Sequence, residues 1–261
     1  MNDELFSVAD QVVLVSGGSR GIGRAIAQGF ADRDAQVIVT GRNAETLQAT
    51  AADLSQDNRP VEPIVCDVAE TGDTANCVRA ALEKFGRIDT LINVAGVNIR
   101  QKAETFTPED YDFILDINLR GAYFLSLEVG RHMIERGAGV QINVDSLNTY
   151  APLKGVLPYA MSKFGLVGMT RGLATEWGPH GIRVNTLAPG FILTDLTRKL
   201  WSQPHMQKWA DANTPLKRLG EVDDMLGATL FLASKASAFM TGQVVRVDGG
   251  VTAGISWPIE L

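Results

Sequence analysis

Three residues in the middle of the chain have types and a spacing that suit proton transfer. Tyr159 and Lys163 are four positions apart, and Ser146 lies thirteen positions before the tyrosine. Residues four apart on a helix project from the same face. A lysine ammonium beside a phenol stabilises the phenolate and lowers its pKa from about 10. The pattern predicts a tyrosine that exchanges a proton with a substrate oxygen, although it also fits an exposed helical pair.

A glycine-rich turn near the start of the chain favours the catalytic interpretation. The apolar run Val12–Val15 leads into Ser-Gly-Gly-Ser-Arg-Gly-Ile-Gly, and a helical pattern follows. Glycines permit the tight turn and let backbone and helix approach closely, so that the helix N-terminus faces a pyrophosphate. The Gly-Lys-Ser/Thr sequence of nucleotide hydrolases is absent. We expect a dinucleotide to be held by Gly17, Ser19, Arg20, Gly21, Ile22 and Gly23.

The end of the second apolar run indicates which dinucleotide. It reads Thr40-Gly41-Arg42, without the acidic residue that usually binds the ribose 2′-hydroxyl of NAD. Arg20 and Arg42 could grip a 2′-phosphate through charge-assisted hydrogen bonds, or could be two solvated surface arginines. We expect NADP(H) to be preferred, with NAD(H) as the alternative.

Composition argues against several other classes of function. The 261 residues carry a formal net charge of −6, which disfavours a nucleic-acid or anionic-membrane surface. No apolar run is long enough to span a membrane. Two cysteines that need not pair suit a reducing cytoplasm, where we expect the protein to act. Three scattered histidines predict no metal site.

Short apolar runs alternate with helical patterns along the whole chain. This order predicts a single α/β domain over residues 1–261: a Rossmann-like, doubly wound parallel sheet of about seven strands with helices on both faces. Residues 195–215 break the alternation and form either a substrate lid or an ordinary packing helix. The expected strands are Val12–Val15, Val37–Thr40, Val61–Cys66, Thr90–Val94, Val140–Val144, Arg183–Ala188 and Val244–Val247.

Together the motifs resemble a classical short-chain dehydrogenase/reductase from Gly17 to Gly250. The resemblance implies a nicotinamide cofactor, a homotetramer and a catalytic tetrad of Asn118, Ser146, Tyr159 and Lys163. Ser146 would bind the substrate oxygen, Tyr159 would act as acid or base, Lys163 would hold the ribose, and Asn118 would hold a water. Asp67 and Asn93 end strands where they would face the cofactor, or they merely form turns. The remaining implied cofactor contacts are Val68, Ala95, Gly96, Pro189, Gly190, Ile192 and Thr194.

Within this family the chain is similar to gluconate 5-dehydrogenases and related sugar-acid or polyol reductases. The likeness rests on Leu5-Phe6-Ser7 and on residues 41–47 and 237–244. Arg100 would pair with a substrate carboxylate or is a surface residue, and Asn148 would bind sugar hydroxyls. Trp201 would cover the substrate and favours instead an apolar ketone. Asp145 is expected on the opposite strand face from Ser146, in a structural hydrogen bond or else as a substrate-site carboxylate.

These observations predict an oxidoreductase that interconverts a ketone and a secondary alcohol on a small sugar acid, keto-sugar or polyol. The main alternative is a 3-oxoacyl-(acyl carrier protein) reductase, which shares the tetrad. Such an enzyme needs a basic surface for its acidic carrier, and the only candidates besides scattered lysines are Arg120, Arg131 and Arg136. A nucleotide-binding regulator without activity is a third reading, which an intact tetrad disfavours.

Overall fold

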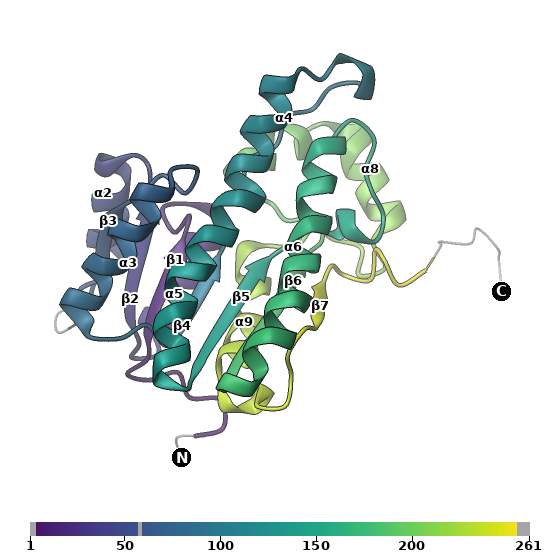
Figure 1. The fold of residues 1–261 in the computed structure, drawn as a ribbon. Coiled ribbons are helices and arrows are strands. Elements are labelled where there is room, and N and C mark those ends of the chain that lie inside the picture. The colour runs from purple at the N-terminus through teal and green to yellow at the C-terminus, as the bar shows by residue number, and fades with distance from the viewer. Residues whose placement is uncertain (1–3, 57–58, 255–261) are drawn as a thin grey trace.

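The centre of the computed structural model is a seven-stranded sheet in which every neighbouring pair of strands is parallel (Figure 1). The structure describes residues 4–56 and 59–254. The strand order is β3-β2-β1-β4-β5-β6-β7, which confirms the predicted Rossmann-like fold class. The strands are β1 (Val12–Ser16), β2 (Gln36–Gly41), β3 (Glu62–Val65), β4 (Thr90–Asn93), β5 (Gly139–Val144), β6 (Ile182–Pro189) and β7 (Val244–Val247).

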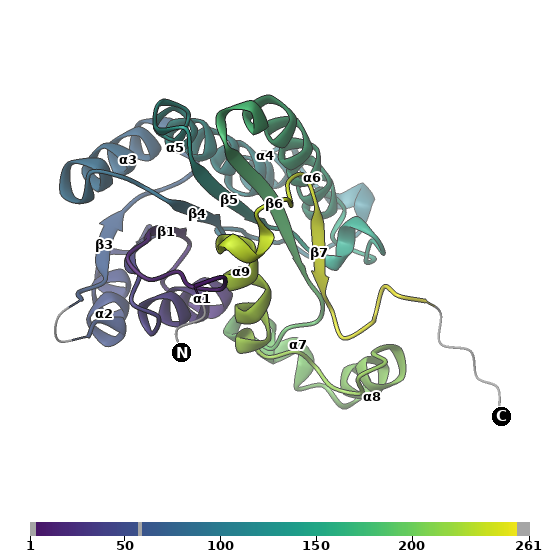
Figure 2. The same ribbon diagram turned by 90° about the horizontal axis from the view of Figure 1, so that it is seen from below.

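Helices cover both faces of this sheet, as Figure 2 shows. Helices α3, α5 and α6 lie on one face, and α1, α2 and α9 lie on the other. In the described ranges the α-helices are α1 (Gly21–Ala31), α2 (Ala44–Leu54), α3 (Thr71–Phe85), α4 (Pro108–Leu115), α5 (Ala122–Arg136), α6 (Leu157–Trp177), α7 (Asp195–Trp201), α8 (Pro204–Asn213) and α9 (Leu226–Ala233). Shorter helical turns are η1 (Ala103–Thr105), η2 (Asp116–Gly121), η3 (Leu147–Thr149), η4 (Gly178–His180), η5 (Val222–Met225) and η6 (Lys235–Ser237).

Local sequence signals set several helix ends. The side chain of Asn43 accepts a hydrogen bond from the Thr46 N–H and caps α2. Thr107 and Asp110 form a reciprocal capping box at the start of α4. Helix α3 stops at Gly86, whose φ of 72° is left-handed and costs glycine little. These residues fix where α2 and α4 begin and where α3 ends.

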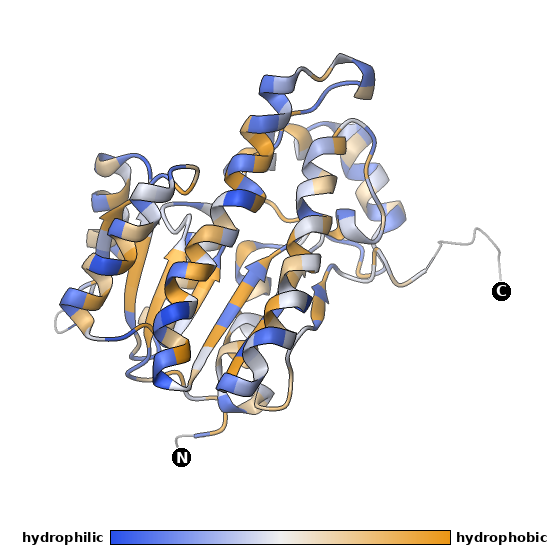
Figure 3. Ribbon diagram, in the orientation of Figure 1, coloured by the Kyte–Doolittle hydropathy of each residue, from blue (hydrophilic) through white to orange (hydrophobic). Residues whose placement is uncertain are grey.

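Each face of the sheet buries its own apolar core. Along β1, Val13 and Val15 contact the α1 side, while Val12 and Leu14 contact the α3 side. Because successive side chains of a strand point to opposite faces, a strand covered on both sides must be apolar throughout. This explains the continuous apolar runs in the sequence, which appear as orange strands in Figure 3.

A row of buried polar side chains crosses the sheet near the carboxyl ends of its strands. Asn93 pairs in register with Asn143, and Asn143 pairs with Thr186. Asn93 Nδ2 donates to Asn143 Oδ1 at 2.9 Å, and Asn143 Nδ2 donates to Thr170 Oγ1 at 2.8 Å. The hydroxyls of Thr170 and Thr186 are 2.8 Å apart. Since Thr170 lies on α6, this row fixes that helix against β5 and β6.

Residues 195–215 form two short helices, α7 and α8, instead of one. Trp201 and Ala210 from this segment pack with Leu147 and Phe191 in a third, smaller apolar cluster. The segment therefore covers the chain just after β5 and β6. Within the ranges given above, no helix combines the length and the apolar content needed to cross a bilayer.

Candidate active site

The structure brings Ser146, Tyr159 and Lys163 together at the carboxyl end of β5. Tyr159 and Lys163 lie in the first two turns of α6, and Ser146 lies two residues beyond the end of β5. Lys163 Nζ donates to the carbonyl of Val144 at 2.7 Å and lies 5.6 Å from the centroid of the Tyr159 ring. The Ser146 hydroxyl hydrogen-bonds the Tyr159 oxygen closely enough to lower the pKa of the phenol. The predicted spacing therefore produces one compact group of side chains.

Burial dominates the acidity of Tyr159. Burial raises the pKa of the phenol to about 12, and the negative charge of Asp145 also raises this pKa. The hydrogen bond with Ser146 and the positive charge of Arg100 lower the pKa, but by less than burial raises it. The expectation that Lys163 brings this pKa below its ordinary value is therefore wrong for this arrangement. The lysine ammonium points to the Val144 carbonyl, and desolvation outweighs the nearby charges. Tyr159 is consequently protonated at neutral pH, which is the form that can donate a proton to a carbonyl oxygen.

Lys163 is also governed by burial. Its side chain is almost completely enclosed, and burial lowers the pKa of its ammonium to about 8 while the charge of Asp145 raises it. The lysine is therefore charged at neutral pH. One ammonium hydrogen is used by the Val144 carbonyl, and the other two can bind ribose hydroxyls.

Asp145 lies closer to the site than the alternation of a strand predicts. Strand β5 ends at Val144, so the rule that neighbours point to opposite faces no longer applies at Asp145. Its Oδ2 accepts a hydrogen bond from Thr149 Oγ1 at 2.6 Å, which confirms a structural hydrogen bond. Burial raises the pKa of the carboxyl to about 6, while the Thr149 hydrogen bond and the Lys163 charge lower it. The negative charge of Asp145 raises the pKa of both the Lys163 ammonium and the Tyr159 phenol.

Asn118 is fully buried in the π-helical turn η2 between α4 and α5. Its Oδ1 accepts from the Val97 N–H at 2.7 Å, and its Nδ2 donates to the Val97 carbonyl at 2.9 Å and to Ser162 Oγ at 3.1 Å. The side chain thus ties the loop after β4 to helix α6. The expected water contact of Asn118 stays a prediction.

The glycine turn after β1 has the shape of a phosphate cradle. Gly17 has a φ of 75°, and a Cβ there would come within 2.7 Å of the Ala95 nitrogen. A Cβ on Gly23 would lie 2.2 Å from the Gly17 carbonyl oxygen, and one on Gly21 would lie 3.8 Å from the Thr194 side chain. Arg20 makes no side-chain hydrogen bond as the N-cap of α1, so the first N–H groups of α1 are open to phosphate oxygens. These residues fit a nicotinamide dinucleotide.

The two arginines predicted to bind a 2′-phosphate lie beside this turn. A Cβ on Gly41 would be 3.4 Å from Ser19 Oγ, which places the end of β2 next to the glycine turn. The Arg42 side chain is 55% exposed, and its Nη1 lies 4.0 Å from Asp67 Oδ2. Asp67 Oδ1 accepts from the Ala69 N–H at 3.1 Å. The structure therefore joins Asp67 to Arg42 at the rim of the site.

The geometry of the site agrees with what comparison with known proteins finds. A family model described as enoyl-(acyl carrier protein) reductase matches residues 17–252. Gluconate 5-dehydrogenase of Gluconobacter oxydans is 37% identical over 252 residues, which are 97% of this chain and 98% of that protein. The 3-oxoacyl-(acyl-carrier-protein) reductase FabG of Chlamydia pneumoniae is 38% identical over 240 residues, or 92% of this chain and 96% of that protein.

A solved structure supports the same assignment. The crystal structure of a gluconate 5-dehydrogenase from Burkholderia cenocepacia in complex with NADP and tartrate superimposes with a TM-score of 0.93 at 34% identity, covering 97% of this chain and 99% of that one. This chain belongs to the short-chain dehydrogenase/reductase family. It is an NAD(P)-dependent enzyme that acts on CH–OH groups, as its relatives do.

The other cofactor contacts expected from the family lie along the same edge of the sheet. The side chain of Asn93 is used in the buried polar row, where its Nδ2 donates to Ser126 Oγ and to Asn143 Oδ1. A Cβ on Gly190 would be 2.6 Å from Asp248 Cα, and one on Gly96 would be 3.4 Å from Asn118 Oδ1. The remaining predicted positions lie at strand or helix ends at this edge: Val68, Ala95, Pro189, Ile192 and Thr194.

The three predicted substrate residues differ in how available they are. Arg100 is exposed, and its charge reaches Tyr159. Asn148 is 4% exposed, with its Nδ2 on Ser146 Oγ and its Oδ1 on the Leu153 N–H, both at 2.9 Å. Trp201 is 4% exposed and packs edge-on against Phe191 at 5.2 Å. Of these three, Arg100 alone has an exposed side chain, and the other two predicted substrate residues, Ser146 and Tyr159, belong to the tetrad.

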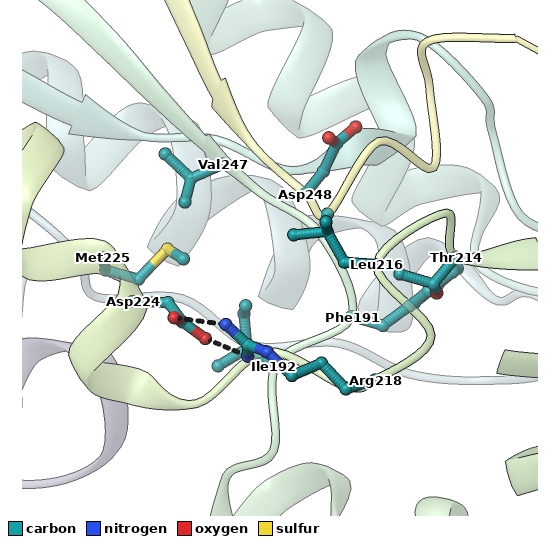
Figure 4. A pocket seen from close by; sticks show the side chains of 11 residues that line it. Phe191, Ile192, Thr214, Leu216, Arg218, Asp224, Met225, Val247 and Asp248 are labelled. Carbon is teal, nitrogen blue, oxygen red and sulfur yellow. Dashed lines mark hydrogen bonds and ion pairs between the residues drawn. The ribbon is translucent and has the colours of Figure 1, made fainter. Parts of the chain in front are cut away.

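A cavity of about 100 Å³ lies where the segments after β6 and β7 meet η5 (Figure 4). It is lined by Phe191, Ile192 and Met225, and by an Arg218–Asp224 pair with two hydrogen bonds of 2.6 and 2.8 Å. Arg218 holds the pKa of Asp224 down at about 2. None of the tetrad lines this cavity, so we place the chemistry at the carboxyl end of β5.

Sequence reasoning overlooked the backbone groups and neighbours that hold the tetrad in place. The Val144 carbonyl, which anchors Lys163, carries no side-chain signal in the sequence. The hydrogen bond from Thr149 to Asp145 could not be predicted either, because the sequence does not indicate the path of the chain after β5. In the part of the chain that the structure describes, no three His, Cys, Asp or Glu side chains are grouped as metal ligands.

The pKa of Asp145 gives a pH-dependent prediction for stability. Because burial raises this pKa from 3.8 to about 6, the folded chain holds the proton more tightly than the unfolded chain. The protonated Asp145 carboxyl therefore stabilises the folded chain below about pH 4, and this stabilisation is lost as the pH rises to about 6. We therefore compare the free energy of unfolding of wild type with that of Asp145→Asn. The wild-type value minus the variant value should fall by about 3 kcal/mol as the pH rises from about 4 to about 6.

Urea unfolding of both proteins across this pH range measures the difference. Asp211→Asn, at an exposed position on α8, is the matched control for the loss of a carboxylate. A difference between wild type and Asp145→Asn that does not change with pH would contradict the burial of the Asp145 carboxyl.

Proposed function

We propose that this enzyme reduces the ketone of a sugar acid or keto-sugar to a secondary alcohol with NADPH, and catalyses the reverse oxidation. The observation that carries the proposal is the exposed cation of Arg100, whose charge acts on the proton donor Tyr159. A cation there can hold a substrate carboxylate while the ketone faces the tyrosine. The gluconate 5-dehydrogenase relatives, one of them solved with NADP and tartrate, support this substrate class.

The position of Arg100 is set by the loop that follows β4. The N–H of its neighbour Gln101 donates to the Gly155 carbonyl at 3.0 Å, and Gln101 Nε2 donates to Asp110 Oδ2 at 2.7 Å. These bonds hold the loop next to the start of α6, two residues after Gly155. Among the described residues no carboxylate forms a salt bridge with Arg100. Its charge is therefore available to an anionic substrate.

Each member of the tetrad has a defined task in this reaction. The Ser146 hydroxyl donates a hydrogen bond to the carbonyl oxygen, and protonated Tyr159 gives its proton to that oxygen as negative charge develops there. Lys163, anchored on the Val144 carbonyl, uses its remaining hydrogens to orient the ribose. The dinucleotide, when bound, supplies or accepts the hydride. In the oxidation the phenolate of Tyr159 takes the proton of the alcohol.

The preference for NADP(H) rests on charge at the edge of the cradle. Arg20, Ser19 and Arg42 surround the place where β2 ends, and Gly41 puts no carboxylate there. The contact with Asp67, at 4.0 Å, is long enough for Arg42 to turn toward a phosphate. Guanidinium groups match phosphate oxygens in geometry as well as charge.

Helices α7 and α8 are proposed to act as the lid of the substrate site. Trp201 from α7 and Ala210 from α8 pack on Leu147, the residue next to Ser146. A lid in this place would exclude water from the reacting oxygen. The homotetramer and the cytoplasmic location stay predictions.

The reduction of 3-oxoacyl groups on a carrier protein is a less favoured function, although the Chlamydia relative has that activity in its name. The basic residues expected to meet the carrier are engaged within the chain. Arg120 donates to the Ala69 carbonyl, Arg131 pairs with Glu128, and Arg136 pairs with Asp89. The assembled tetrad likewise disfavours an inactive regulator.

Substrate class is tested by NADPH consumption with 5-ketogluconate, L-sorbose, fructose and an acetoacetyl thioester. We expect turnover of the keto acid, and we expect Arg100→Gln to raise KM for 5-ketogluconate by about tenfold or more while KM for the neutral sugars stays unchanged. Lys102→Gln removes a nearby charge and is the control. Turnover of the thioester alone would contradict the sugar-acid proposal.

Cofactor preference is tested by replacing Arg42. Loss of a charge-assisted phosphate contact predicts that Arg42→Ala weakens NADPH binding by roughly 10- to 100-fold and leaves NADH binding nearly unchanged. Nucleotide fluorescence gives both dissociation constants. Arg79→Ala on the far side of α3 is the control, since Arg79 pairs only with its own helix. An equal loss of affinity for NADPH and NADH would contradict a contact between Arg42 and the 2′-phosphate.

A further inference from the structure

The hydroxyl of Ser146 receives two hydrogen bonds from a single residue. The N–H of Asn148 donates to Ser146 Oγ at 3.2 Å, and the side-chain Nδ2 of Asn148 donates to the same oxygen at 2.9 Å. A serine hydroxyl has two acceptor lone pairs and one hydrogen. Both lone pairs are therefore occupied, and the hydrogen is what Ser146 can offer to a third group.

The orientation of the Asn148 amide is fixed by a third contact. Its Oδ1 accepts a hydrogen bond from the Leu153 N–H at 2.9 Å. An amide NH2 group cannot accept from an N–H, so the nitrogen must face Ser146 and the oxygen must face Leu153. Asn148 is buried, which keeps water from competing for either end. The side chain thus acts within the chain and not on a ligand.

We propose that Asn148 is a positioning residue that fixes Ser146 as a hydrogen-bond donor toward the reacting oxygen. The proposal rests on the proposed function, because it assigns a direction to the hydroxyl that binds the substrate. In the reduction, the fixed Ser146 hydrogen meets the carbonyl oxygen as negative charge develops. In the oxidation, Ser146 cannot accept the alcohol proton, so that proton must go to Tyr159.

The hydrogen bond between Ser146 and Tyr159 agrees with this direction. Ser146 stabilises the phenolate form of Tyr159, as a hydroxyl that donates to the phenol oxygen does. With both lone pairs of Ser146 Oγ occupied by Asn148, Tyr159 is a neighbour to which the Ser146 hydrogen can be donated. The substrate oxygen in the proposed reaction takes the place next to both hydroxyls.

The test compares Asn148→Asp with Asn148→Ala. Aspartate has the shape of asparagine, but its ionised carboxylate accepts the Ser146 hydrogen and turns the hydroxyl inward. We expect kcat of Asn148→Asp to fall by about 10²- to 10³-fold, as on removal of an oxyanion donor, with KM and the NADPH dissociation constant within about threefold of wild type. Asn148→Ala keeps the backbone donor and should lose about tenfold.

Two readouts separate positioning from a merely structural role. Protonation restores a donor at position 148, so kcat of Asn148→Asp relative to wild type should rise as pH is lowered from 8 toward 5, while the ratio for Asn148→Ala stays flat. In a Ser146→Ala background, Asn148→Asp should cost at most about twofold more, because its effect passes through Ser146.

The outcomes distinguish this inference from the function on which it rests. A wild type that reduces no carbonyl compound overturns the proposed function and this inference with it. An active wild type whose Asn148→Asp variant keeps its kcat, shows no pH rescue, or loses activity equally in the Ser146→Ala background overturns the inference alone. Thermal unfolding and NADPH binding of each variant identify any that fail to fold.

Discussion

The site depends on how helix α6 is attached to the end of β5. Thr170 joins the buried polar row through Asn143 and Thr186, and about two turns earlier Lys163 is held by the Val144 carbonyl. Both contacts are buried, where an unmade hydrogen bond is costly, so they fix the rotation and the height of the helix. Because β5 also delivers Ser146, one strand end and one helix set the geometry of the whole group.

Burial gives this site its electrostatic character. The enclosed Lys163 and Asp145 have opposite charges, and each shifts the pKa of the other toward its charged form, against the effect of desolvation. Tyr159 is half-buried and protonated, and Arg100 brings a further positive charge from the loop after β4. The result is a proton donor that is acted on by the buried charge of Asp145 and by an exposed cation, and the proposed anionic ketone substrate rests on that cation.

Much of this could be predicted from the sequence because it depends on local patterns. The alternation of apolar runs predicts the strands, and the glycine turn and the Tyr159–Lys163 spacing indicate the site. The rest depends on the path of the chain after β5, although the apolar run predicts the end of that strand at Val144. That path decides the direction of Asp145, the contact of Asn148 with Ser146 and the use of the Val144 carbonyl by Lys163, and no sequence periodicity reports it.

The central claim is that Tyr159 donates the proton to a ketone substrate. The most direct measurement is NADPH consumption with 5-ketogluconate by wild type and Tyr159→Phe, together with the NADPH dissociation constant of both. The account predicts that the variant loses turnover by about 10³-fold or more, while its NADPH dissociation constant changes by less than about threefold. Turnover by Tyr159→Phe near the wild-type rate would contradict the account.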